Sequence, residues 1–300
     1  MIIDPREYST SEFYGYLTSA VVPRPIAFAS TISREGKVNL SPYSFFNAFS
    51  SNPPVLVFSP VNSTRDNTTK NTLDNVREHD EVVINVVNYA MVEQMSLAST
   101  AYEKGVNEFA KAGFTQVPSK QVRPPRVGES PVAFECKVKQ VIALGEEGGA
   151  GHLVICEVLL AHVREEVLDG DGKIDLQRLD AVGRMGGNLY CRASGQALFE
   201  VKRPGREVGI GIDQLPSYIR ESPVLTGSNL AQLAGVPALP DESLLQKYAN
   251  NTQVKSVRAH PDKVRLAHQT AQDLLARDAV ELAWAVLLAV GPEALRQYGG

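Results

Sequence analysis

The first two-thirds of the chain contains short segments in which apolar positions alternate with polar ones or run together, a pattern typical of β-strands. Turn residues separate the first of these segments, with Gly36 after the first and Pro53 and Pro54 before the third. The predicted strands are residues 25–32, 38–49, 55–59, 81–87, 132–144 and 152–163. The last two flank a glycine-rich segment, 146–151, and therefore predict a long antiparallel hairpin.

Helical spacing of apolar residues predicts helices between these strands, at 71–77, 91–101 and 106–111, the last stopped by Gly113. Beyond about residue 205 the pattern changes. A proline-punctuated stretch is followed by helical spacing over 264–275 and 279–290, and Gly291-Pro292 precedes a last short helix. We therefore expect a β-rich domain, residues 1–205, and a mainly helical extension, 206–300, that packs on that domain or on a partner subunit.

Composition narrows the functional classes. Hydrophobic residues make up 43% of the chain and charged residues 21%, which predicts a folded globular protein. The formal net charge of −4 argues against nucleic acid or an anionic membrane as a partner, because both attract basic surfaces. The longest apolar run, 282–290, is too short to span a bilayer.

The N-terminal residues and the cysteines both favour the cytoplasm. Residues 1–5 lack the basic and apolar regions of a secretory signal. Cys136, Cys156 and Cys191 form no C-x-x-C pair, so we interpret them as buried thiols in a reducing compartment.

Several common ligand motifs are missing from the sequence. Neither the dinucleotide-binding G-x-G-x-x-G after a strand nor the P-loop is present. Residues 169–172, Asp-Gly-Asp-Gly, resemble the start of a calcium loop, but Lys173 stands where a ligand is needed, so a tight turn is predicted. The five histidines show no metal-ligand spacing. We expect no metal site.

A cluster of hydroxyl and cationic side chains surrounds the start of the predicted helix at 71–77. Backbone N–H groups and the helix dipole already favour an anion at such a position, so a terminal phosphate would suit it. The alternative is a solvated loop with an ordinary helix cap, since the same residue types favour caps without any ligand. The members are Ser63, Thr64, Arg65, Lys70, Asn71 and Thr72.

The segment 39–47 mixes polar residues with aromatic and apolar ones. Asn39, Ser41, Ser44 and Asn47 interrupt the apolar positions. Such a strand offers an apolar wall together with amide and hydroxyl partners for the edge of a heterocycle.

Seven stretches together resemble the flavin reductase-like proteins, a family with an FMN-binding split barrel that includes flavoredoxins and reductase components of two-component monooxygenases. Their order and spacing cover roughly residues 20 to 190. The stretches are 24–31, 39–47, 53–54, 70–75, 112–114, 129–131 with 135–136, and 184–187 with Tyr190.

The resemblance implies where FMN would bind. Phe46 and Asn47 would border the ring system. Arg184 and Tyr190, which resemble the family's Arg-x-Gly-Gly signature, would lie near the flavin or substrate face, or else Arg184 would form a salt bridge beside a structural turn. The residues expected to lie along the flavin are Ser30, Thr31, Asn39, Leu40 and Ser41. The residues expected to hold the phosphate are Ser63, Arg65, Lys70 and Thr72. Asn71 stands at a helix-capping position where the family commonly has aspartate.

The resemblance also implies fold and activity. The expected fold is mainly β with α: an antiparallel FMN-binding split β-barrel with flanking helices, followed by the helical C-terminal extension. The expected function is an FMN-dependent oxidoreductase that transfers hydride or electrons through bound FMN, from NADH or NADPH to flavin for a partner oxygenase. The flavin would carry the chemistry, so no catalytic side chain is expected.

The resemblance also implies a homodimer, whichever function applies. Two alternative functions stay open. One is a flavoredoxin-like electron carrier that holds FMN tightly and exchanges electrons with a protein partner. The other is a non-catalytic flavin-binding barrel whose extension docks a partner protein.

Overall fold

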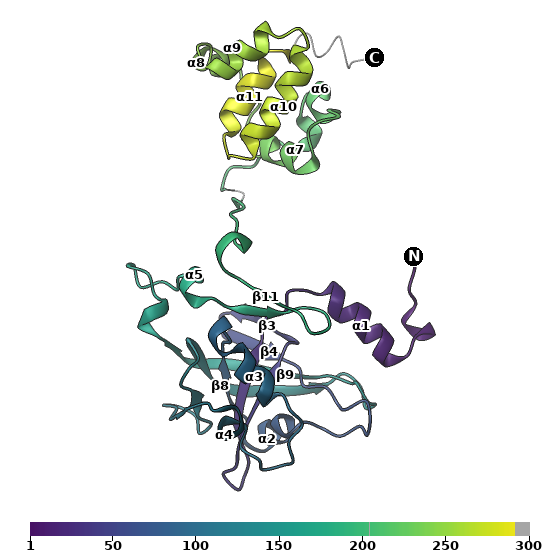
Figure 1. Ribbon diagram of the computed structural model, residues 1–300, viewed down its shortest axis with the longest axis vertical. Coiled ribbons are helices and arrows are strands. Elements are labelled where there is room, and N and C mark those ends of the chain that lie inside the picture. Colours follow the sequence, from purple (N-terminus) through teal and green to yellow (C-terminus); the bar gives the residue numbers. More distant parts are fainter. Residues whose placement is uncertain (204, 292–300) are drawn as a thin grey trace. The chain divides into compact units, whose positions relative to one another are not determined.

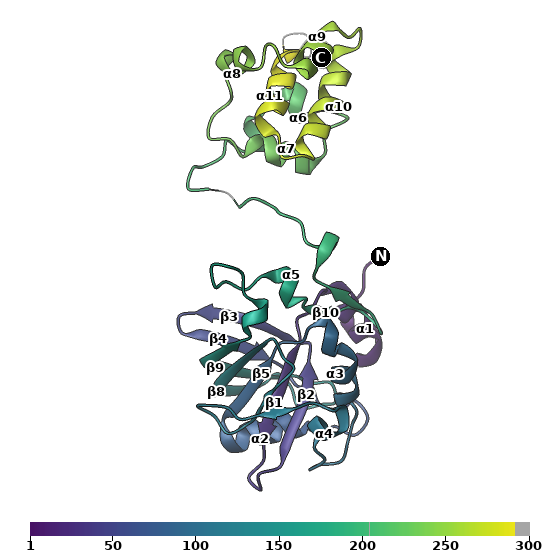
Figure 2. The same ribbon diagram turned by 60° about the vertical axis from the view of Figure 1, so that its left-hand side comes forward.

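The chain forms two compact units, Met1–Phe199 and Glu200–Gly300, in a computed structural model that describes residues 1–203 and 205–291. Figures 1 and 2 show that the first unit contains the β-sheet and the second is helical. The predicted domain boundary near residue 205 stays a prediction. The last short helix predicted after Gly291-Pro292 lies outside the described residues.

The first unit is built on a seven-stranded sheet in which every neighbouring pair is antiparallel. The strand order is β2-β1-β5-β8-β9-β4-β3. Antiparallel strands with flanking helices are the predicted fold class, which is therefore confirmed. The strands are β1 Ala27–Ile32, β2 Val38–Tyr43, β3 Phe46–Ser51, β4 Pro54–Phe58, β5 Glu81–Asn85, β8 Val132–Ala143 and β9 His152–Val163.

The two ends of the sheet meet at a corner of the chain. Strands β2 and β3 lie at opposite ends of the strand order, yet only Ser44 and Phe45 separate them in sequence. The three Cα–Cα steps from Tyr43 to Phe46 span at most about 11 Å, so the sheet must curl until its ends approach each other. The rings of Tyr43 and Phe58 lie 5.4 Å apart across this closure.

The corner corrects the prediction of one strand over 38–49. The chain forms two strands there, because it leaves one end of the sheet at Ser44 and enters the other end at Phe46. The N–H of Ser59 donates to the Phe45 carbonyl at 2.8 Å and holds the corner against the end of β4.

The predicted long hairpin is confirmed as β8 and β9. Its register shifts between Glu135 and Cys136 and again between Val138 and Gln140. Such bulges bend the strand and increase its twist, which helps the sheet to curl.

Two hydrophobic clusters occupy opposite faces of the curled sheet. Helix α2, Asn71–His79, places Leu73 and Val76 against the inner cluster, which includes Ala29 of β1. Helices α3, Val92–Ala98, and α4, Glu108–Ala112, cover the outer cluster, which includes Phe28 of β1. Successive residues of a strand face opposite sides, so β1 contributes to both clusters.

Smaller elements complete the unit. Helix α1, Thr10–Ala20, was not predicted. Helix α4 ends at Gly113, the residue predicted to stop it, which has a φ of 71°. The turn predicted at 169–172 is confirmed by the Gly172 N–H, which donates to the Asp169 carbonyl at 3.1 Å. The short strands are β6 Gln116–Val117, β7 Arg126–Val127, β10 Val182–Arg184 and β11 Tyr190–Arg192, with helix α5 at Leu176–Leu179 and 3-10 turns at Pro5–Glu7, Tyr89–Met91, Glu165–Val167 and Gly195–Ala197.

The second unit is a helical bundle with its own core. Trp284 is fully buried in this core and donates from Nε1 to the Leu233 carbonyl at 3.1 Å. None of the described helices in either unit has the length and apolar character needed to cross a membrane. The elements are a 3-10 turn at Ile212–Gln214 and α6 Ser217–Arg220, α7 Gly227–Ala234, α8 Glu242–Lys247, α9 Thr252–Ala259, α10 Lys263–Leu275 and α11 Val280–Leu288.

Candidate functional site

The start of α2 is open to a ligand. Lys70 occupies the N-cap position, and its side chain makes no capping hydrogen bond. The first N–H groups of a helix have no partner one turn back within the helix. The Leu73 N–H donates to the Lys70 carbonyl at 2.9 Å, so the N–H groups of Asn71 and Thr72 are the free donors at this end of the described chain. The neighbouring hydroxyl of Thr69 is turned away from them, because it donates to Asp74 at 2.9 Å.

The loop before α2 is folded tightly on itself. The N–H of Ser63 donates to the Thr68 carbonyl and the N–H of Asn67 donates to the Ser63 carbonyl, both at 2.9 Å. Asn67 has a left-handed conformation, φ 55°, and its amide donates to the Glu146 carbonyl at 2.8 Å. The loop is thereby fixed before any ligand arrives.

The glycine-rich segment of the β8–β9 hairpin makes room for this loop. A Cβ on Gly148 would lie 3.0 Å from the Ser63 carbonyl oxygen. Gly149, at φ 89°, donates its N–H to the Asn62 carbonyl at 3.0 Å. Backbone contact of this kind requires residues without side chains.

Two cations beside the α2 start are exposed. Arg65 and Lys70 form no ion pair with any acidic residue in the described part of the chain, 1–203 and 205–291. Lys70 is itself the N-cap residue, so its charge is available to an anion at this helix end, and Arg65 adds an unpaired charge in the loop before it.

A row of buried polar side chains connects α2 to β1 and β2. The Asn39 amide donates to the Thr72 hydroxyl at 2.8 Å, and the Asn75 amide donates to the Thr31 hydroxyl at 3.0 Å. Burial raises the pKa of Tyr43 at the end of this row to about 12. The structure thus brings together Thr31, Asn39 and Thr72, and the Thr72 side chain points inward.

Two predicted site residues, Leu40 and Ser30, lie on the opposite, outer face of the sheet. Leu40 packs in the outer cluster beneath α3 and α4. Its N–H donates to Glu108 at 3.0 Å, and burial raises the pKa of that carboxyl. Ser30 follows Ala29 and precedes Thr31, so by strand alternation it also faces outward. Its hydroxyl is buried and has no hydrogen-bond partner in the described chain.

The remaining predicted ring contacts lie on other strands. Ser41 is half-buried on β2, Phe46 is half-buried on β3, and Asn47 is exposed on β3. The Asn47 side chain accepts a hydrogen bond from the next backbone N–H, that of Ala48, at 2.8 Å.

A cavity of about 470 Å³ opens beside the first turns of α2. Asn39 and Asn71, two of the predicted cofactor-binding residues, line it, and so does Asn75. Lys37 and Lys104 also line it, and neither was predicted as a site residue. Its remaining lining residues are Ser33, Glu35, Val38 and Gly105.

Arg184 and Tyr190 lie together on the β10–β11 hairpin. The guanidinium carbon of Arg184 is 4.6 Å from the centre of the Tyr190 ring, a cation–π contact. No salt bridge of Arg184 occurs within the described residues. The contact leaves the flavin-face assignment of the pair a prediction.

Arg24 begins the first of the seven stretches that resemble the family, and its role in the structure was not predicted. It is 6% exposed, and its guanidinium donates to the carbonyls of Val21 at 2.7 Å and Met185 at 3.1 Å. It thereby joins the end of α1 to the Gly186-Gly187 turn, where a Cβ on Gly186 would lie 2.6 Å from Ser19 Oγ.

Comparison with known proteins gives one family match and several structural likenesses. Residues 19–177, more than half of the chain, match the flavin reductase like domain. Nitrilotriacetate monooxygenase component B from Bacillus cereus is 29% identical with a TM-score of 0.62, and the likeness covers 67% of this chain and 98% of that one.

Two further solved structures resemble the chain. A protein described as a flavin reductase with a split barrel domain, from Shewanella frigidimarina NCIMB 400, is 25% identical with a TM-score of 0.56, over 67% of this chain and 100% of that one. Flavoredoxin of Desulfovibrio vulgaris (Miyazaki F) is 25% identical with a TM-score of 0.51, over 61% of this chain and 91% of that one. The curled antiparallel sheet of the first unit is thus a split barrel.

Proposed function

The chain belongs to the flavin reductase-like family, and from that membership we propose that it is an oxidoreductase that binds FMN on its first unit. Bound FMN would supply the redox chemistry, since its ring system accepts and passes on hydride or electrons. The protein would supply position, access and charge. The choice of FMN rests on the uncapped start of α2 and on the unpaired charges of Lys70, at its N-cap, and Arg65, in the loop before it.

The residues at the start of α2 fit a phosphate dianion. Free N–H groups of the first helical turn donate to an anion, and the helix dipole favours negative charge there. Arg65 and Lys70 add charge-assisted contacts, and Ser63 adds a hydroxyl. Thr72 would contribute its backbone N–H, because its hydroxyl already binds Asn39. Asn71 would contribute from the lining of the adjacent cavity.

The polar row and the β2–β3 corner would hold the ring system. Asn39 and Ser41 lie on one side of β2 and offer amide and hydroxyl groups to a heterocycle. Phe46 offers an apolar surface, and Asn47 is exposed beside it. Thr31 would act by positioning Asn75, while Ser30 and Leu40 would support the site from the outer face of the sheet. Arg184 and Tyr190 would lie near the flavin or substrate face.

We propose NADH or NADPH as the electron donor and a separate oxygenase as the acceptor of reduced flavin. The likeness to nitrilotriacetate monooxygenase component B supports this role. We also propose a homodimer. The exposed apolar side chains of α1, Tyr14, Tyr16 and Leu17, support it, because burying them against a second copy would remove apolar surface from water.

A flavoredoxin-like electron carrier is the second candidate, and the likeness to flavoredoxin favours it. In that case FMN would stay bound through repeated turnover and a protein would deliver the electrons. The non-catalytic docking barrel is the third. It predicts that flavin binds but no donor reduces it.

The phosphate site is tested by replacing Arg65 and Lys70 together with alanine. We expect FMN affinity to fall by about tenfold or more for each cation removed, because each makes a charge-assisted contact. Riboflavin lacks the phosphate, so its affinity should stay unchanged. Flavin fluorescence quenching measures both affinities.

A matched variant removes the same charge elsewhere. Lys139 and Lys173 are exposed and do not belong to the candidate site, so replacing both with alanine should leave FMN affinity unchanged. If the Arg65/Lys70 variant loses riboflavin and FMN affinity equally, or neither, the phosphate does not bind at the start of α2.

A further inference from the structure

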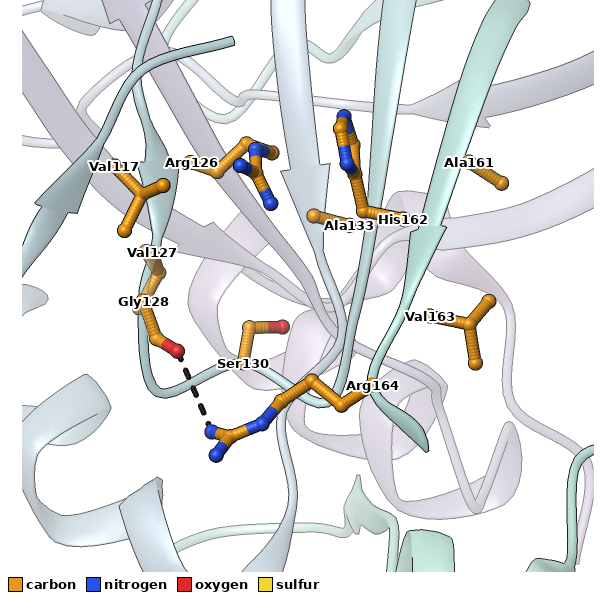
Figure 3. Close-up of a pocket in the computed structure, with 10 residues that line it drawn as sticks. All are labelled: Val117, Arg126, Val127, Gly128, Ser130, Ala133, Ala161, His162, Val163 and Arg164. Atoms are coloured by element: carbon orange, nitrogen blue, oxygen red, sulfur yellow. Dashed lines mark hydrogen bonds between the residues drawn. The ribbon is translucent and has the colours of Figure 1, made fainter. Parts of the chain in front are cut away.

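A second cavity lies away from the start of α2, between the short strand β7 and the ends of β8 and β9. Its volume is about 460 Å³, within the range of small-molecule sites. Figure 3 shows Arg126 and His162 projecting from the two sides of the cavity, with Arg164 crossing toward Gly128. The apolar lining residues are Val117, Val127, Ala133, Ala161 and Val163, and Gly128 and Ser130 complete the wall.

Both arginines keep donors for a ligand. Arg126 uses Nε and Nη2 on the Pro118 carbonyl, at 3.4 and 3.2 Å, and Nη1 has no partner in the described chain. Arg164 uses Nη1 on the Gly128 carbonyl at 3.4 Å and Nε on the exposed Glu166 at 2.9 Å, and Nη2 has no partner there. Arg126 forms no ion pair within the described residues, whereas Arg164 is paired with the solvent-exposed Glu166, a weak contact that a ligand carboxylate can replace.

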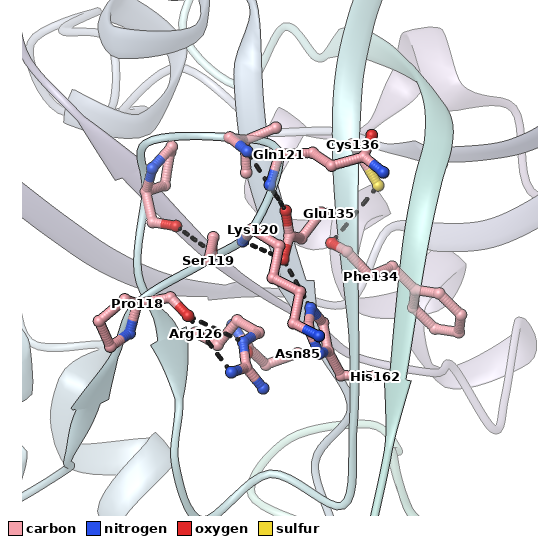
Figure 4. A network of polar contacts seen from close by, with 12 residues as sticks. Asn85, Pro118, Ser119, Lys120, Gln121, Arg126, Phe134, Glu135, Cys136 and His162 are labelled. Atoms are coloured by element: carbon pink, nitrogen blue, oxygen red, sulfur yellow. Dashed lines mark hydrogen bonds and ion pairs between the residues drawn. The ribbon is translucent and has the colours of Figure 1, made fainter.

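The nearest buried carboxylate does not neutralise the arginines. Figure 4 shows that Glu135 is instead surrounded by backbone N–H groups and His162. It accepts from the N–H groups of Lys120, Gln121 and Val122, and His162 Nε2 lies 2.6 Å from its Oε1. Glu135 therefore fixes the loop before β7 and orients the imidazole, and His162 Nδ1 has no partner in the described chain.

Ser130 is not a ligand group in this arrangement. Its hydroxyl lies 2.7 Å from the Val86 carbonyl oxygen and 2.8 Å from the Val132 carbonyl oxygen, and its single proton is donated within this pair. The polar groups left for a ligand are therefore two guanidinium groups and one imidazole nitrogen, set among valine and alanine side chains.

We propose that this cavity, the Arg126–Arg164 pocket, binds a small organic anion in which a carboxylate is attached to an apolar body. The free Nη1 of Arg126 and the free Nη2 of Arg164 donate to the carboxylate, and the valine side chains cover the apolar part. The pocket is a separate site from the start of α2, so the proposal does not depend on flavin binding.

Benzoate is the probe, because it joins a carboxylate to an apolar ring, and benzamide is its neutral match. In the full chain labelled with ¹⁵N-arginine, we expect benzoate to shift the Nε–Hε signals of Arg126 and Arg164 in a saturable manner. Benzamide should not shift them. Replacing both arginines with glutamine should weaken benzoate binding, measured by calorimetry, by about tenfold or more for each charged contact.

Arg123→Gln is the control variant, since Arg123 is exposed, pairs with Glu81 and does not line the pocket. It should bind benzoate as the unaltered protein does. Circular dichroism checks the fold of each variant, and the Arg126→Lys/Arg164→Lys variant, which keeps the charges, should retain part of the affinity. Equal binding of benzamide, or full benzoate affinity in the double glutamine variant, would overturn the proposal.

Discussion

Replacing Glu135 with glutamine should destabilise the first unit, because this carboxylate is fully buried and each of its contacts comes from a hydrogen-bond donor. Its two oxygens accept from three backbone N–H groups at 2.5 to 3.2 Å and contact His162 at 2.6 Å. Glutamine is neutral, and its NH₂ group would take the place of one of the two carboxylate oxygens and face the backbone N–H donors there. Leaving a buried donor unpaired costs about 1–3 kcal/mol, so we expect a loss of about 2–4 kcal/mol in the free energy of unfolding.

The effect should also depend on pH. Burial by itself raises the pKa of Glu135, but the backbone N–H groups and His162 outweigh it and hold the pKa below its usual value. Between the folded and the unfolded pKa, the Glu135 carboxyl of the unfolded chain therefore binds a proton more readily than that of the folded chain. The stabilisation from Glu135 is fully present above the unfolded pKa, about 4.3, and is lost as the pH falls through the lower folded pKa.

The assay separates the two units by their signals. The single tryptophan, Trp284, lies in the core of the second unit, so its fluorescence in urea reports that unit. Far-ultraviolet circular dichroism reports both. We expect Glu135→Gln to lower the midpoint of the circular dichroism transition at pH 7 and leave the fluorescence transition unchanged.

Glu157→Gln serves as the matched control, because Glu157 is partly exposed and pairs with Lys139 at the surface. Such a pair contributes about 0–1 kcal/mol. The reasoning is refuted if Glu135→Gln unfolds at the same urea concentration as the unaltered protein, or if its deficit is the same at pH 3 as at pH 7.

Two further predictions concern the units and the thiols. A chain ending after Phe199 should fold and bind FMN with unchanged affinity, since the first unit has its own core; loss of the circular dichroism signal or of FMN binding in flavin titration would contradict this. Iodoacetamide should alkylate the half-buried Cys191 of the native protein first, because burial raises the pKa of Cys136 to about 12 and also raises the pKa of Cys156, which suppresses both thiolates. Peptide mass spectrometry before and after denaturation in guanidinium would reveal any early reaction at Cys136 or Cys156.

Strand patterns predicted most of the first unit because each strand has its own local signal. The twelve-residue strands β8 and β9 alternate long enough to be recognised individually. The corner at Ser44 was not predicted, because the apolar residues continue through it and only the meeting of distant strands requires a break. Helix α1 was missed because Thr18 is its only buried residue, although the capping box formed by Ser9 and Glu12 was present as a signal.

The candidate site could be predicted as a list of residues more readily than as an arrangement. Adjacent strand residues face opposite sides, so Ser30 and Thr31 cannot both face one ligand on β1. Motif similarity includes both without separating ligand contacts from supporting residues. Lys37 and Lys104 carried no local signal, because their approach to the start of α2 depends on how distant loops fold.

FMN binding and its reduction are tested together by an absorption spectrum of the protein with added FMN, followed anaerobically as NADH and then NADPH are supplied. We expect the FMN spectrum to change on binding and the oxidised-flavin band to bleach with one of the two nucleotides. Binding without bleaching would favour the electron carrier. An unchanged FMN spectrum, together with separation of the protein from FMN on gel filtration, would contradict the proposal that this chain binds FMN.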